Sequence, residues 1–240
     1  MSRLFDDAAS DRLLTTSTPV TAPPFTMAVW FNTDALQVQT VFGIVDSGGN
    51  ADYWCVGINA SNQAYLTIYD NGPIYAVSTK AYSINTWHHF CATITNDTTR
   101  QVYLDGGNPD PSPPVNNMSP DGADRIGIGV LARAALTGYF SGCIAEAAIW
   151  NMILSAREIA ALGNKGFSPL LVRPESLVGY WPLLKSLRDK LGIYDLTAVG
   201  TVESEHCRVV YPASPLVFNH LAAGGNMAVL AQHYKKMRVA

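Results

Sequence analysis

Short apolar segments separated by turn-forming residues run through most of this 240-residue chain. Ser47-Gly48-Gly49-Asn50, Asp70-Asn71-Gly72-Pro73 and Asp105-Gly106-Gly107 mark three of the separations with the residues that tight turns prefer. Between them apolar and polar residues alternate, as in residues 64–69, and a period of two places successive side chains on opposite faces of a strand. The pattern predicts an all-β protein in which two antiparallel sheets pack face to face.

One short helix interrupts the strands. Ser155-Ala156-Arg157-Glu158 is a capping box, in which serine and glutamate satisfy free backbone N–H groups reciprocally, and Gly163 ends the segment. Ile159 and Leu162 lie three residues apart and mark one apolar face. We therefore expect a helix over 155–163, lying on a sheet edge.

Two motifs resemble the laminin-G-like, concanavalin A-like jelly rolls. The first joins residues 85–92 (NTWHHFCA) to residues 102–106 (VYLDG), and the second joins residues 140–151 (FSGCIAEAAIWN) to residues 154–159 (LSAREI). The resemblance implies a jelly-roll sandwich, with Trp87 and Phe140 in its core. This chain has Ala145 where the family usually has aspartate, which argues against an inherited metal or charge role for that position.

Two adjacent histidines lie within the first motif. Side chains of consecutive strand residues point to opposite faces, so His88 and His89 cannot ligate one metal from a regular strand. The resemblance implies that His89 is partly buried, and we expect His88 to lie in solvent.

The chain divides into a body and an arm. Residues 178–183 (VGYWPL) also resemble a strand of the same family, so residues 1–211 are predicted to form one jelly-roll domain and residues 212–240 a partly helical C-terminal arm. The arm has three basic residues and no acidic one, a charge of +3, whereas the rest has thirteen basic and nineteen acidic residues, a charge of −6.

An apolar stripe on the arm predicts protein–protein interaction. After Gly224-Gly225, four apolar residues recur at helical spacing, and three more precede the glycines. The predicted docking residues are Leu216, Val217, Phe218, Met227, Leu230, Tyr234 and Met237. The partner would be subunits of a larger assembly or a second copy of the chain, and the alternative is that the arm packs on its own sandwich.

No catalytic residue is assigned from the sequence. Asp46-Ser47-Gly48-Gly49 resembles the nucleophile region of trypsin-like proteases, yet no histidine precedes His88 to act as its base. Related jelly rolls include glucanases, whose chemistry needs paired carboxylates on one strand. Glu146 stands alone, and Glu203 with Glu205 lies near the end of the predicted domain with no aromatic residue beside it.

No cofactor or metal site is assigned either. Calcium is the one alternative left open, because oxygen-bearing side chains occupy several predicted turns. These residues are Asp46, Asn50, Asp52, Asp70, Asn71, Asn96 and Asp97. Turns favour Asp and Asn without any ligand, and no loop has the ligand spacing of an EF-hand. The four cysteines, Cys55, Cys91, Cys143 and Cys207, have no metal-binding spacing and are predicted to be free thiols.

A carbohydrate site would use exposed aromatic rings and amide hydrogen bonds at a loop rim. Tyr53, Tyr69, Asn71 and Tyr75 are the candidates, although tyrosine is also an ordinary strand residue.

Charge and hydropathy exclude other partners. The net charge is −3 and no basic stripe exists, so a nucleic-acid partner is not expected. No segment has the roughly 20 apolar residues of a membrane span, and the acidic start at Asp6-Asp7 argues against a signal peptide. Together with the resemblance, these features predict a non-enzymatic structural or adhesion module. We expect a bacteriophage virion component, a decoration or tail protein made in the host cytoplasm. A carbohydrate-binding lectin is the alternative, followed by a glucanase-like hydrolase.

Overall fold

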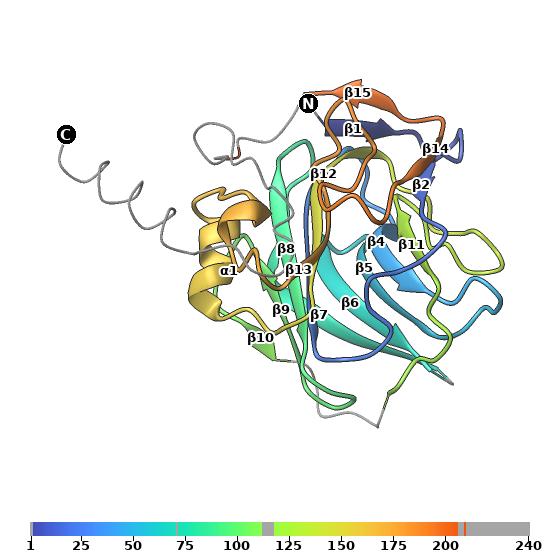
Figure 1. Ribbon diagram of the computed structural model, residues 1–240. Helices are drawn as coiled ribbons and strands as arrows, with labels where there is room; N and C mark the ends of the chain where they lie inside the picture. The colour runs from blue at the N-terminus through green and yellow to red at the C-terminus, as the bar shows by residue number, and fades with distance from the viewer. Residues whose placement is uncertain (1, 71, 112–117, 206–208, 210–240) are drawn as a thin grey trace, which may run out of the picture.

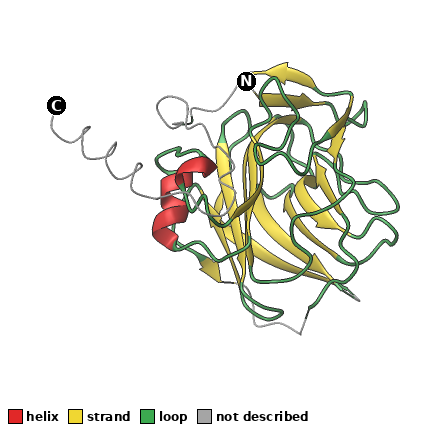
Figure 2. Ribbon diagram, in the orientation of Figure 1, coloured by secondary structure: helices red, strands yellow, loops and turns green. Residues whose placement is uncertain are grey.

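The computed structural model describes residues 2–70, 72–111, 118–205 and 209. Two antiparallel sheets pack face to face in this part of the chain, and one short helix lies beside them (Figures 1 and 2). The predicted sandwich is therefore confirmed. No helix in the described residues is both long and apolar enough to cross a membrane.

The first sheet has eight strands. Seven of them follow the order β10-β9-β8-β3-β12-β1-β15. The eighth, β13, pairs with the second half of β12, whereas β1 pairs with its first residues. Their bounds are β1 (Ser2–Phe5), β3 (Phe25–Thr33), β8 (His88–Ile94), β9 (Arg100–Leu104), β10 (Asp110–Pro111), β12 (Gly142–Trp150), β13 (Leu177–Trp181) and β15 (Val202–Ser204). Strands from both ends of the described chain thus join one sheet.

The second sheet has seven strands in the order β14-β2-β11-β4-β5-β6-β7. Their bounds are β2 (Arg12–Leu14), β4 (Gln39–Val45), β5 (Tyr53–Ile58), β6 (Gln63–Tyr69), β7 (Pro73–Ala81), β11 (Arg125–Ile128) and β14 (Thr197–Val199). Strands β4 to β7 are consecutive in sequence and in space, so this half of the sheet is a simple meander.

The main core lies between the sheets and takes alternate residues from each strand. In β6, Leu66 and Ile68 point into this core, and in β8 Phe90 and Ala92 do so. Phe140 is fully buried there, as predicted. Trp87 is not, because it is half-buried beside the start of β8, so its assignment to the core was wrong.

The helix α1 (Ala156–Gly163) covers the outer face of the eight-stranded sheet rather than a sheet edge. Ile159 and Leu162 pack in a second cluster with Cys91 and Trp150, on the face opposite the main core. The helix ends against the turn after β9, where a Cβ atom on Gly163 would meet the backbone of Gly106. The helix was correctly predicted in sequence but wrongly placed.

The capping box is formed as predicted. Ser155 Oγ accepts from the Glu158 N–H at 3.4 Å, and the Glu158 carboxylate accepts from the Ser155 N–H at 2.8 Å. Arg173 also pairs with Glu158, which ties the cap to the segment after the short 3₁₀ helix η1 (Pro169–Leu171).

Removing the cap should destabilise the protein measurably. We expect Ser155→Ala to lower the free energy of unfolding by about 1 kcal/mol, since the side-chain acceptor for the first helical turn is lost. Urea denaturation of the purified chain measures this change. Ser155→Thr, which keeps the hydroxyl, is the control, and equal losses in the two variants would contradict the role of the cap.

Cys55, Cys91 and Cys143 are free thiols, which confirms the prediction for these three. Cys207 and residues 213–240 lie outside the described residues, and so do all seven predicted docking residues. The docking role of the arm stays a prediction.

Candidate functional site

The outer face of the seven-stranded sheet carries a group of tyrosines over β5, β6 and β7. Trp54, Leu66 and Ile68 point inward, so the residues that alternate with them point outward. We use the name tyrosine surface for Tyr53, Tyr65, Tyr69 and Tyr75 together.

The tyrosine rings form two contacting pairs. Tyr53 and Tyr69 lie directly opposite each other on β5 and β6, and their rings stack with centroids 5.3 Å apart and an interplanar angle of 27°. Tyr65 and Tyr75 meet edge to face at 5.6 Å. The result is a layer of two aromatic pairs, one across β5 and β6 and the other across β6 and β7.

A glycine provides the space for this layer. Tyr65 lies opposite Gly57 on β5, and a Cβ atom on Gly57 would come within 2.7 Å of the Tyr65 ring. The ring can lie flat across β5 because Gly57 has no side chain. Sequence reasoning overlooked Tyr65, although the alternation in β6 places it on the same face as Tyr69.

The layer is partly open to solvent. Tyr75 is 46% exposed and Tyr69 is half-buried, whereas Tyr53 is 7% and Tyr65 9% exposed. Tyr53 therefore supports the Tyr69 ring instead of presenting its own face. The fourth candidate from the sequence, Asn71, lies outside the described residues.

None of the four tyrosine hydroxyls makes a hydrogen bond within the described part of the chain. Tyr82 and Tyr103 differ, since their hydroxyls donate to the Asn59 carbonyl at 3.0 Å and to Gln101 at 2.9 Å. Burial raises the pKa of Tyr53 to about 12, and it also raises the pKa of Tyr65, so both phenols stay protonated at neutral pH. These hydroxyls are available as donors to a bound molecule.

Residues 130–139 border the tyrosine surface. Val130, Leu131 and Ala132 pack on the outer face with Tyr53 and Cys55. The same segment is held to the β4–β5 turn, because the Ala135 N–H donates to Asn50 Oδ1 at 3.0 Å and Arg133 Nη1 donates to the Asn50 carbonyl at 2.8 Å. One side of the tyrosine surface therefore has a fixed wall.

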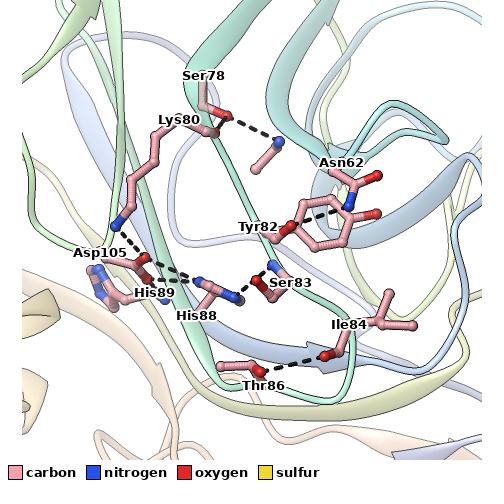
Figure 3. A network of polar contacts seen from close by, with 11 residues as sticks. Asn62, Ser78, Lys80, Tyr82, Ser83, Ile84, Thr86, His88, His89 and Asp105 are labelled. Carbon is pink, nitrogen blue, oxygen red and sulfur yellow. Dashed lines mark hydrogen bonds and ion pairs between the residues drawn. The ribbon is translucent and has the colours of Figure 1, made fainter.

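A second polar network surrounds the two histidines (Figure 3). His88 Nε2 accepts from the Ser83 N–H at 2.9 Å, so the ring proton sits on Nδ1, which donates to Asp105 at 3.0 Å. Lys80 also contacts Asp105, at 2.7 Å. His88 is 8% exposed, so its placement in solvent was wrong, because this network and the rings of Phe31 and Tyr82 enclose it.

This histidine network is structural. Both ring nitrogens of His88 have hydrogen-bond partners. Asp105 accepts hydrogen bonds from His88, Lys80 and the His89 N–H. Burial alone raises the pKa of Asp105, but these hydrogen bonds outweigh it and hold the pKa well below its usual range. The network connects β7, β8 and the turn after β9.

Glu146 and Glu203, the carboxylates considered for hydrolysis, lie in different environments. Glu146 is 2% exposed and accepts from the Tyr180 hydroxyl at 2.5 Å, at a β-bulge in β12. Glu203 is exposed on the edge strand β15, opposite Arg3. Within the described residues, no three His, Cys, Asp or Glu side chains are grouped so that they could hold a metal ion.

Comparison with known proteins gives a family match and several structural neighbours. The family described as the concanavalin A-like lectin/glucanases superfamily (Laminin_G_3) matches residues 7–160, which is more than half of the chain. A search of the curated proteins found no match.

Three solved structures illustrate the neighbours. A heptameric pentraxin from Limulus polyphemus has a TM-score of 0.55 and 13% identity, over 68% of this chain and 81% of its own. A putative carbohydrate-binding protein from Bacteroides ovatus has a TM-score of 0.59 and 16% identity, over 87% and 61%. The CBM40 module of a Ruminococcus gnavus sialidase, bound to α2,3-sialyllactose, has a TM-score of 0.54 and 10% identity, over 62% and 91%. These identities indicate a shared fold.

Proposed function

Because the chain belongs to the concanavalin A-like lectin/glucanase superfamily, we propose that it is a non-catalytic carbohydrate-binding module whose ligand lies on the tyrosine surface. The carbohydrate binding recorded in the names of the Bacteroides and Ruminococcus neighbours supports the ligand class. The position of the ligand on the tyrosine surface is argued from the exposed ring of Tyr75.

The observation that carries the proposal is the group of tyrosines with free hydroxyls on one open sheet face. The apolar C–H face of a sugar ring packs on an aromatic ring, and sugar hydroxyls accept hydrogen bonds from phenols. Tyr75 offers an exposed ring, and its contact with Tyr65 holds that ring in place. A ligand would therefore meet a surface that needs little ordering on binding.

Removing the exposed ring should weaken binding without unfolding the protein. We expect Tyr75→Ala to weaken the affinity for the best-bound glycan about tenfold or more, because the stacking surface is lost. A glycan array followed by calorimetric titration of its strongest ligand measures this effect. Thermal denaturation should show little change, since Tyr75 is 46% exposed.

Two variants sharpen this test. Tyr75→Phe keeps the ring and loses only the hydroxyl, so it separates stacking from hydrogen bonding. Ile193→Ala changes a side chain that is 66% exposed outside the seven-stranded sheet and should leave binding unchanged. If the unaltered protein binds no glycan, or if Tyr75→Ala binds as well as the unaltered protein, the proposal fails.

The assembly role on a bacteriophage particle remains a separate proposal. It depends on the arm at residues 212–240 and not on the tyrosine surface.

A further inference from the structure

The helix α1 covers only part of the outer face of the eight-stranded sheet. The apolar cluster beneath it takes side chains from β3, β8, β9, β12 and β13, and among the described residues none comes from β1 or β15. In Figure 1, α1 lies beside β8 and β9, away from β1 and β15. The cover that α1 provides therefore stops short of these two strands.

A row of apolar side chains crosses the remaining part of this face. Val202 on β15 lies opposite Leu4 on β1, and Leu4 lies opposite Cys143 on β12. Directly opposed residues of antiparallel strands point to the same face, and Phe5, the neighbour of Leu4, points into the main core, so the row faces outward. Val202 is 59% exposed, Leu4 is 38% exposed, and Cys143 is half-buried.

Trp30 on β3 enlarges this apolar surface. Val29 and Phe31 on either side of it point into the main core, so Trp30 points outward, and it is half-buried. It is the diagonal neighbour of Cys143 across the β3–β12 pair. We use the name open face for Leu4, Trp30, Cys143 and Val202 together. An exposed apolar group of this kind indicates an interaction surface.

The chain leaves the described structure at the rim of the open face. β15 is an edge strand of the sheet, and Ser2 Oγ donates to the Glu205 carbonyl at 2.5 Å, which holds the end of β15 against β1. Val209 is the one residue after Glu205 that the structure describes, and it is half-buried. The last 35 residues of the chain, 206–240, therefore begin beside the open face.

The first part of this stretch is apolar in sequence. Residues 209–218 (VVYPASPLVF) contain six Val, Leu, Phe or Tyr residues and no charged residue. Pro212 and Pro215 have no backbone N–H, so the segment cannot extend the sheet as a regular strand beside β15. Burial of its side chains therefore requires a face of the protein rather than the sheet edge.

The length of the segment and its charge favour a return to the open face. Leu216 follows Ser204 by twelve residues, which span up to about 40 Å when extended, whereas three strand spacings cover about 15 Å. Residues 206–240 have four basic residues and no acidic one, a charge of +4, and residues 1–205 have twelve basic and nineteen acidic residues, a charge of −7. Because the segment is tethered, its effective concentration at its own open face exceeds that of a second copy.

We infer that residues 209–218 fold back over the open face of their own chain and cover Leu4 and Val202. This contact is independent of carbohydrate binding, because the tyrosine surface belongs to the other sheet. It also divides the predicted docking residues into two groups. Leu216, Val217 and Phe218 pack on the open face, and the residues left for a partner are Met227, Leu230, Tyr234 and Met237.

The thiol of Cys143 provides the measurement. It is half-buried in the open face, whereas Cys55 and Cys91 are fully buried elsewhere. The full chain carrying Cys207→Ser would be treated with iodoacetamide, and the alkylation rate of each cysteine followed by peptide mass spectrometry. Leu216→Asp combined with Phe218→Asp should speed the alkylation of Cys143 about tenfold or more, because a charged segment no longer stays on an apolar face.

A matched variant places the same charges further along the chain. Met227→Asp combined with Met237→Asp should leave the alkylation rate of Cys143 unchanged, because these residues lie beyond the segment. Cys55 and Cys91 are 4% and 0% exposed, so they should stay unmodified in every folded variant. Their modification would identify a variant that has unfolded, and Leu216→Ala combined with Phe218→Ala would then replace the aspartate pair.

A substitution on the sandwich tests the open face itself. Val202→Asp should also speed the alkylation of Cys143, since it places a charge where the segment packs. Val199→Asp changes another exposed valine, on β14 in the other sheet, and should leave the rate unchanged.

The dependence on protein concentration identifies the occupant. Protection of Cys143 that is the same at all concentrations and is lost in the Leu216 and Phe218 variant supports the inference. Protection that falls on dilution would show that a second copy supplies the segment, and would overturn it. Equal alkylation of Cys143 with and without the two aspartates would overturn it as well.

Discussion

Phe140→Ala is expected to lower the free energy of unfolding by about 3 to 5 kcal/mol, because it leaves a cavity where the two sheets meet. The Phe140 ring has no exposed surface and meets the Phe5 ring edge to face at 6.3 Å. Phe5 in turn packs against Gly129, where any Cβ atom would overlap the ring. Strand β1, the end of β11 and the start of β12 therefore depend on one contact.

The neighbours of Phe140 have little freedom to fill such a cavity. The Phe140 N–H donates to the Gly129 carbonyl at 3.0 Å, which fixes the backbone, and Phe5 is already 1% exposed. Denaturant titration should show a lower midpoint with an unchanged slope. Phe140→Leu, which keeps most of the volume, should lose less than about 1.5 kcal/mol. A loss below about 1 kcal/mol in Phe140→Ala would show that the ring is not part of the packed core.

Local signals in the sequence were sufficient for the elements of the fold. The alternation in β6, the turn residues around it and the capping box at Ser155 each involve residues close in sequence, and each predicted its element correctly. The position of an element in the fold was harder to predict. The position of α1 depends on the contact between Gly163 and Gly106, which are 57 residues apart, and no local pattern encodes it.

The candidate site was only partly predictable for the same reason. Tyr69 and Tyr75 follow from alternation within single strands, and Tyr65 could have been found in this way. The stacking of Tyr53 on Tyr69, in contrast, depends on the register between β5 and β6. The burial of His88 similarly depends on Asp105 and Ser83, which reach it from the turn after β9 and the segment after β7.

Acid should destabilise the protein through His89 before it affects the carboxylates. His89 is 2% exposed, its Nδ1 atom has no hydrogen-bond partner among the described residues, and its ring lies beside Trp30 at 5.2 Å. Burial lowers the pKa of His89 to about 4, although the nearby charge of Asp105 acts in the opposite direction. The folded protein therefore keeps this ring neutral over a range where the unfolded chain protonates it.

The sign of the effect follows from proton linkage. Between about pH 6.5 and pH 4 the unfolded state binds a proton at His89 and the folded state does not, so the free energy of unfolding falls as pH falls. The total loss is about 3 kcal/mol. Asp105 acts in a lower window, because its pKa is depressed in the folded state. Its contribution is present above the ordinary aspartate pKa, near 4, and is lost only below it.

A substitution isolates the contribution of His89. Unfolding free energies of the unaltered protein and of His89→Gln would be measured by urea denaturation at intervals from pH 7 to pH 4. The difference between the two curves should change by about 3 kcal/mol over this range, with the variant less sensitive to acid. His88 is present in both proteins, so any contribution from it cancels in the difference. Parallel curves would show that His89 is protonated as readily in the folded chain as in the unfolded one, and would contradict its enclosure between Trp30 and the Asp105 network.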